Sequence, residues 1–132
     1  MKTFIRFDVK GTFRGSEHVS TFTDESYTEP GISCYELNAE GVKNLIRYWT
    51  TQACLTRIED YENMNLTVFA GEKVGTGTDF EDCATCTEVL GEIDAAEFFE
   101  KYLETEERYF DEEITEDEMY ETLEKYIREA IA

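Results

Sequence analysis

The sequence predicts an α+β fold in which an antiparallel sheet of about four to five strands carries one central helix and two acidic C-terminal helices. Apolar residues alternate with polar ones in several segments before residue 93, and afterwards they recur at three- and four-residue spacing. A length of 132 residues, 41% hydrophobic and 14% aromatic, fits one folded domain, 1–132. Within it, 1–93 form a β-rich part with one helix, and 94–132 form an acidic helical pair.

Three strands are expected before the first helix. Residues 3–13 alternate as a half-buried strand does, with Thr3, Ile5, Phe7 and Val9 on one face and Arg6, Asp8 and Lys10 on the other. A turn at 14–17 and a second strand at 18–23 complete a predicted hairpin. The loop 26–31, which holds the single proline, leads to a third strand at 32–37.

Asn38 is a favourable N-cap for the central helix. The residues on its buried face are expected to be Val42, Leu45, Ile46, Trp49 and Ala53. Residues 56–63 are polar and predicted to be irregular. A strand at 66–70 is expected to end in the glycine-rich segment 71–77, and another strand is predicted at 85–93, although Gly91 interrupts its pattern.

Each C-terminal helix is preceded by residues at capping-box spacing. Asp94 and Glu97 precede a helix whose predicted buried stripe is Phe98, Phe99, Tyr102, Leu103, Tyr109 and Phe110. Thr115 and Glu118 precede a last helix expected to bury Met119, Leu123, Tyr126, Ile127 and Ala130. Aromatic residues left exposed beside the acids of these helices would suit an interface.

The net charge of −19 is far larger than the magnitude of about 2–8 that keeps a small domain soluble. It is also concentrated: residues 92–132 hold 16 acids and four bases, whereas the preceding 91 residues hold 15 and eight. Such self-repulsion opposes compactness, so the charge suggests a function. Its field repels nucleic acids, anionic membranes and phosphorylated substrates, and attracts a groove lined by lysine and arginine.

The acids of the helical pair are the candidate partner-binding residues. They are Glu97, Glu100, Glu104, Glu107, Asp111, Glu112, Glu113, Glu116, Asp117, Glu118 and Glu121. Spacings of three and four residues separate carboxylates by about 4.5–6 Å along a helix, a sparser version of the one charge per about 1.7 Å in duplex DNA. A charge run is often only a solvated face, but adaptation to salt would spread acids over the whole surface.

Signals for chemistry are few. Cys83 and Cys86 form a C-x-x-C pair, but a zinc site needs two more ligands, and neither Cys34 nor Cys54 belongs to a second such pair. Nearby acids would raise a thiol pKa, which favours ordinary reduced cysteines over a redox pair. The single histidine, His18, has no identifiable partner. Residues 71–78 lack the order of a phosphate-binding loop, so the sequence predicts neither an enzyme nor a cofactor.

In size, in acidity and in the acidic helices between Glu97 and Glu121, the chain resembles anti-CRISPR and antirestriction proteins of phages and mobile elements, many of which are DNA mimics. The resemblance implies an inhibitor that acts in the bacterial cytoplasm without a cofactor. Its partner would be a basic nucleic-acid-binding protein such as a Cas nuclease or a restriction enzyme, whose DNA-binding surface the acids block.

Two alternatives remain open: a non-catalytic acidic protein–protein interaction module, and a small metal or redox protein that uses Cys83 and Cys86. Direct nucleic-acid binding is disfavoured because the chain has no basic stripe. Charges interrupt the N-terminus, and no apolar run approaches 18 residues, so we expect neither a signal peptide nor a membrane span, and a cytoplasmic location. The sequence does not distinguish a monomer from a homodimer.

Overall fold

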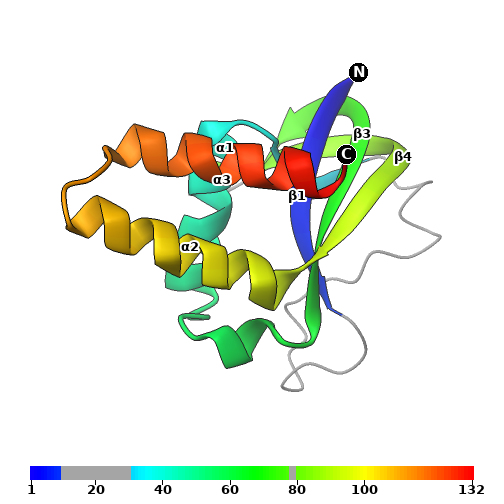
Figure 1. Ribbon diagram of the computed structural model, residues 1–132. Helices are drawn as coiled ribbons and strands as arrows, with labels where there is room; N and C mark the ends of the chain where they lie inside the picture. The colour runs from blue at the N-terminus through cyan, green and yellow to red at the C-terminus, as the bar shows by residue number, and fades with distance from the viewer. Residues whose placement is uncertain (10–30, 78–79) are drawn as a thin grey trace.

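The computed structural model describes residues 1–9, 31–77 and 80–132, and it has the predicted α+β architecture (Figure 1). In chain order the elements are β1 (Lys2–Val9), β2 (Ile32–Glu36), α1 (Ala39–Arg47), the π-helical η2 (Tyr48–Gln52), the 3₁₀ helix η3 (Ile58–Tyr61), β3 (Met64–Thr76), β4 (Asp82–Asp94), α2 (Ala95–Phe110) and α3 (Glu116–Ala130). The predicted turn at 14–17, the strand at 18–23 and His18 lie outside the described residues.

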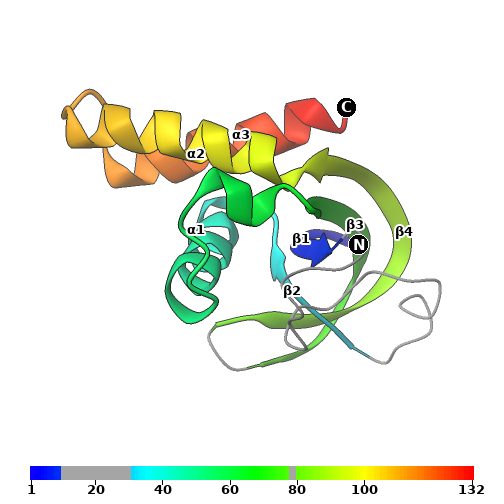
Figure 2. The same ribbon diagram turned by 90° about the horizontal axis from the view of Figure 1, so that it is seen from below.

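The four described strands form an antiparallel sheet that closes on itself in the order β1-β2-β4-β3 (Figure 2). β1 pairs with β2 and β3, and β4 pairs with the other edges of the same two strands. The β3–β4 pairing shifts register at three places, between Val68 and Phe69, Ala70 and Gly71, and Lys73 and Gly75. Such irregularities bend long strands, as closure of a small sheet requires.

The predicted ends of these long strands were wrong. β3 continues through the glycine-rich segment to Thr76, and β4 begins at Asp82 rather than at 85. Gly71 is needed inside β3 because a Cβ there would lie 1.6 Å from the carbonyl oxygen of Thr85 on β4. Gly71 therefore allows the backbones of β3 and β4 to approach closely at a bend instead of ending the strand.

β1 is buried on both faces, which corrects the prediction of a half-buried strand. Ile5 and Phe7 belong to the main core, whereas Phe4 packs in a smaller cluster inside the closed sheet. Arg6 and Asp8, predicted to face solvent, are only 7% and 4% exposed. Closure of the sheet covers the face that an open, one-sided sheet would leave in water.

The two buried charges on β1 pair with each other. Nε of Arg6 lies 2.9 Å from Oδ1 of Asp8. Burial raises the pKa of the Asp8 carboxyl above its ordinary value, because the charged form is desolvated, while the Arg6 guanidinium and the hydroxyl of Thr67 act in the opposite direction. The fold therefore contains an ion pair whose two members depend on one another.

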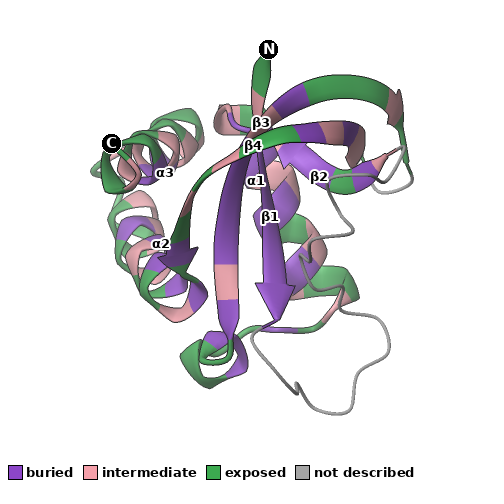
Figure 3. Cartoon of the chain, turned by 90° about the vertical axis from the view of Figure 1, so that its right-hand side faces the viewer, coloured by how far each residue is buried: buried purple, intermediate pink, exposed green. Residues whose placement is uncertain are grey.

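The three α-helices share the main core with the sheet. Phe98, Leu123 and Ile127 are fully buried in it together with β-strand residues. α2 and α3 run antiparallel as a helical hairpin, and the turn between them is the part of the hairpin farthest from the sheet (Figures 1 and 2). Exposed residues follow the outer sides of both helices, whereas β1 is buried along most of its length (Figure 3).

Several predictions for helix ends and stripes need correction. Phe110 is 68% exposed and Ala130 is exposed, because each lies in the last turn of its helix, while Tyr126 is only half-buried. α1 ends at Arg47, and η2 continues it, so the half-buried Ala53 lies beyond both elements.

Segment 56–63, predicted to be irregular, contains η3. There Tyr61 is buried and its hydroxyl donates to the carbonyl of Leu55 at 2.8 Å.

The predicted caps are confirmed in part. Asn38 accepts from the N–H of Gly41 at 2.7 Å and caps α1. Thr115 and Glu118 form the complete capping box at α3, with reciprocal bonds of 3.1 and 3.0 Å. Asp94 caps α2 alone, through the N–H of Ala96, without a reciprocal bond from Glu97. Glu97 instead accepts from the Tyr126 hydroxyl on α3 at 3.2 Å.

Candidate functional site

The α2–α3 hairpin, which comprises residues 95–130, holds every acid that the sequence analysis singled out. The first four, Glu97, Glu100, Glu104 and Glu107, are exposed along one side of α2. They lie opposite the apolar stripe that includes Phe98 and Tyr102, so packing of that stripe against the core fixes the direction of the acidic row.

The acidic row continues around the hairpin turn. Asp111, Glu112, Glu113, Asp117, Glu118 and Glu121 are exposed, and Glu116 is half-buried. The whole set thus occupies one helical hairpin, and its densest part surrounds the turn that lies far from the sheet (Figure 2). We call residues 107–118 the acidic tip.

Ion pairs offset only part of this charge. Lys101 lies 3.7 Å from Glu104, Arg108 lies 3.5 Å from Glu113, and Lys43 on α1 lies 2.8 Å from Glu116. Within the part of the chain that the structure describes, the other eight acids of the set make no ion pair. As far as the described residues extend, most carboxylates of the hairpin therefore have no base within ion-pair distance.

Two carboxylates of the tip are held in place by hydrogen bonds. The ammonium of Lys43 lowers the pKa of Glu116, and the backbone N–H of Thr115 lowers the pKa of Glu118. Both directions favour the charged form. These contacts anchor the beginning of α3 to α1 and to its own cap, so the acids there project from a fixed backbone.

The turn of the hairpin is a Schellman motif, in which the N–H of Glu113 bonds to the carbonyl of Arg108 and the N–H of Glu112 bonds to that of Tyr109. Glu112 occupies the left-handed position of this motif, with φ 61°. Glycine is the usual residue there, because any Cβ is strained in that conformation. A charged residue thus stands where stability alone would favour glycine.

We expect Glu112→Gly to raise the free energy of unfolding by about 0.5–1 kcal/mol, since it removes the strain of a left-handed residue and one like charge. Urea denaturation measures the change. Glu113→Gly is the matched control, because it removes the same charge at a position without positive φ and also breaks the pair with Arg108, so it should not stabilise. Equal effects of the two variants would show that charge, not backbone strain, is responsible.

Phe110 gives the acidic tip an apolar element that the sequence analysis placed in the core. Its ring lies beside that of Tyr109, with 5.6 Å between ring centroids, and 68% of the residue is exposed. The signal that could have marked it is its position as the last residue of α2, directly before three consecutive acids. An exposed aromatic residue beside carboxylates is typical of a protein interface.

The four cysteines are far less suited to chemistry. Cys83 and Cys86 lie on β4 three residues apart, so their side chains leave opposite faces of the strand and do not converge on one ion. Burial raises the pKa of the Cys34 and Cys86 thiols, which disfavours the thiolate that metal binding or redox exchange requires. Among the described residues, no three histidine, cysteine, aspartate or glutamate side chains are grouped so that they could hold a metal ion.

Comparison of the chain with protein-family models, with curated proteins and with solved structures found no match. In the described part of the chain, none of the helices combines the length and apolar character that a membrane crossing requires.

Proposed function

We propose that this protein inhibits a bacterial defence nuclease, such as a Cas nuclease or a restriction enzyme, by occupying its nucleic-acid-binding surface in place of DNA. The observation that carries the proposal is the α2–α3 hairpin, which presents eleven acids in one packed unit, three of them in ion pairs with described residues. On this proposal the protein acts in the bacterial cytoplasm without catalysis or a cofactor, as an anti-CRISPR or antirestriction protein does.

The proposed mechanism is electrostatic and competitive. A groove that binds phosphates is lined by lysine and arginine, and a net charge of −19 would accelerate the encounter with such a groove. Carboxylates in rows along α2 and around the acidic tip would then pair with side chains that otherwise contact the DNA backbone. Because the hairpin is packed on the core, little ordering entropy would oppose the binding.

The acidic tip lowers the stability of the fold, and this supports a functional origin of its charge. Like charges at helical spacing destabilise by roughly 0.2–0.5 kcal/mol per pair. The turn also keeps glutamate rather than glycine at the strained position 112. A surface selected only for solubility would need neither feature.

The exposed ring of Phe110 favours one alternative, an acidic interaction module whose partner has no nucleic-acid function. Such a partner would have a basic surface with an apolar pocket that accepts Phe110. The two functions differ in whether DNA competes with the protein for its partner.

Competition with DNA is the direct test of the proposed function. We expect the protein to inhibit duplex cleavage by at least one member of a panel of restriction endonucleases and Cas nucleases. Excess non-cleavable duplex should relieve the inhibition, and so should an increase in salt from about 50 to 200 mM, because screening weakens exposed ion pairs. If excess duplex does not relieve the inhibition, the protein does not act as a DNA mimic. If the protein inhibits no nuclease of the panel, the result counts against a nuclease as the target.

A further inference from the structure

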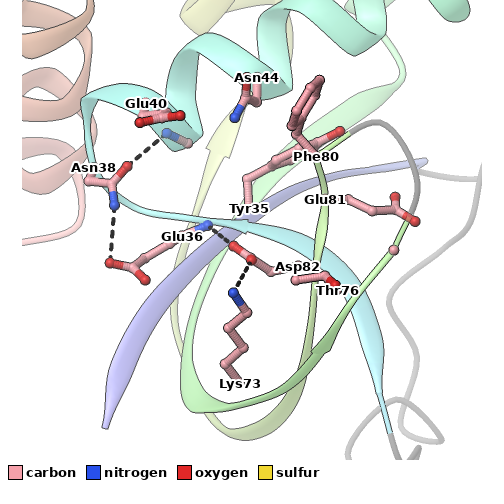
Figure 4. A pocket seen from close by; sticks show the side chains of 12 residues that line it. Tyr35, Glu36, Asn38, Glu40, Asn44, Lys73, Thr76, Phe80, Glu81 and Asp82 are labelled. Carbon is pink, nitrogen blue, oxygen red and sulfur yellow. Dashed lines mark hydrogen bonds and ion pairs between the residues drawn. The ribbon is translucent and has the colours of Figure 1, made fainter.

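A cavity of about 650 Å³ lies away from the hairpin, between β2, the first turns of α1 and the neighbouring ends of β3 and β4 (Figure 4). Aromatic and carboxylate side chains dominate its wall. Those that matter for its chemistry are Tyr35, Glu40, Asn44, Phe80, Glu81 and Asp82. The proposed function does not use this cavity.

Phe80 is the most unusual side chain of the wall. It is 82% exposed and stands at the end of the β3–β4 connection, with its ring on the side of α1 that carries Asn44 (Figure 4). Two separate hollows along α1 are also lined by Phe80 and Asn44, and the basic residue Arg47 lines both of them. A phenyl group left in water, on a residue with φ 61°, contributes little to folding.

The charges around the cavity determine which ligand it can accept. Among the described residues that line this cavity, four bear carboxylates, Glu36, Glu40, Glu81 and Asp82, and one bears an ammonium, Lys73, which lies 3.1 Å from Asp82. Anionic ligands are therefore repelled, and a cation is attracted.

Most of these carboxylates already have donors. Glu36 accepts from Lys2 and Asn38, Asp82 accepts from the backbone N–H of Glu36, and Glu81 accepts from Ser33. Glu40 differs: it is exposed, and among the described residues it makes no side-chain hydrogen bond or ion pair. Its carboxylate is the one best able to accept a new donor.

We infer that the cavity receives an arginine side chain of the protein's basic partner. A guanidinium group is planar, so it can stack on the Phe80 ring and at the same time donate two hydrogen bonds to the Glu40 carboxylate. An ammonium group carries the same charge but lacks the flat face and the paired donors. The inference deepens the proposed function and depends on it only for the basic character of the partner.

Two small probes test the cavity without the partner. Labelled protein is titrated with N-acetyl-arginine amide and with N-acetyl-citrulline amide, which has nearly the same shape but no charge, and the NMR signals of Asn44, Glu40 and Glu81 are followed. We expect saturable shifts with the arginine probe, with a dissociation constant of about millimolar size, and little response to citrulline. Equal responses to both probes, or shifts confined to α2 and α3, would overturn the inference.

Variants of the wall separate stacking from charge. Phe80→Leu keeps an apolar side chain without the ring and should weaken arginine binding about two- to fivefold, whereas Phe80→Trp should keep or strengthen it. Glu40→Gln should weaken it by about two- to fivefold as well. Glu62→Gln, an exposed acid that does not line the cavity, should change nothing. Wild-type affinity in both Phe80→Leu and Glu40→Gln would refute the site.

The experiment also separates this inference from the proposed function. A variant with Glu104, Glu107, Glu112 and Glu113 changed to lysine should lose nuclease inhibition but keep arginine binding in the cavity, because none of the four lines it. If the protein binds arginine in the cavity but inhibits no nuclease, the cavity assignment holds and the proposed nuclease target is wrong. Loss of arginine binding in the hairpin variant would show that the probe responds only to overall charge.

Discussion

Changing Glu104, Glu107, Glu112 and Glu113 to lysine is expected to abolish nuclease inhibition while the fold is kept. All four are exposed on α2 or at the acidic tip, and the change shifts the net charge by eight units in one place. Each reversal replaces attraction by repulsion, worth roughly 1 kcal/mol or more at a charged interface, so affinity should fall by about 1000-fold. Isothermal titration with the inhibited nuclease measures the loss, and circular dichroism monitors the fold.

A matched variant distinguishes the position of the charge from its amount. Glu59, Glu62, Glu72 and Glu88 are exposed acids of the β-rich part, and their change to lysine gives the same net charge. We expect this variant to bind within about tenfold of the wild type, through weaker long-range attraction alone. Similar losses in the two variants would mean that overall charge, and not the hairpin, determines binding.

The second large effect concerns the buried pair on β1. Asp8→Leu or Arg6→Met alone should lower the free energy of unfolding by about 3–5 kcal/mol, because each removes the opposite charge that lies 2.9 Å from the buried charge that remains. The double variant should lie within about 1 kcal/mol of the wild type, since two apolar side chains can replace a buried ion pair. Urea denaturation of all four proteins measures the coupling. Lys125→Met, at an exposed position, should change stability by less than about 0.5 kcal/mol.

The pH dependence of the Arg6→Met variant follows from the raised pKa of Asp8. A folded-state pKa above the unfolded value means that the native protein binds more protons between the two values, so stability falls as pH rises through that window. Without the Arg6 guanidinium the pKa of Asp8 rises further, and the variant should lose less stability relative to the wild type at pH 5 than at pH 8. Glu92, the other charge that acts on Asp8, is kept in both proteins. A difference independent of pH would mean that Asp8 is not responsible.

The helices and most of the acidic surface were predictable because their determinants are local. The three- and four-residue spacing of Phe98, Tyr102 and Leu123 fixes which side of each helix is buried, and the same spacing sends the glutamates to the other side. The Thr115–Glu118 capping box likewise depends on residues within one turn. Phe110 was misplaced because a periodic stripe does not reveal where the neighbouring elements end.

The sequence by itself determined the α+β class, the acidic helical pair and the side of α2 on which its carboxylates lie, since each depends on periodicity over a few residues. Only the tertiary structure decided that the sheet closes, that Arg6 and Asp8 are therefore buried as a pair, and that Phe80 and Glu40 line one cavity. These features join residues far apart in the chain. The free energy of bringing such segments together depends on how whole elements pack, and the pattern of residues within one element does not predict that packing.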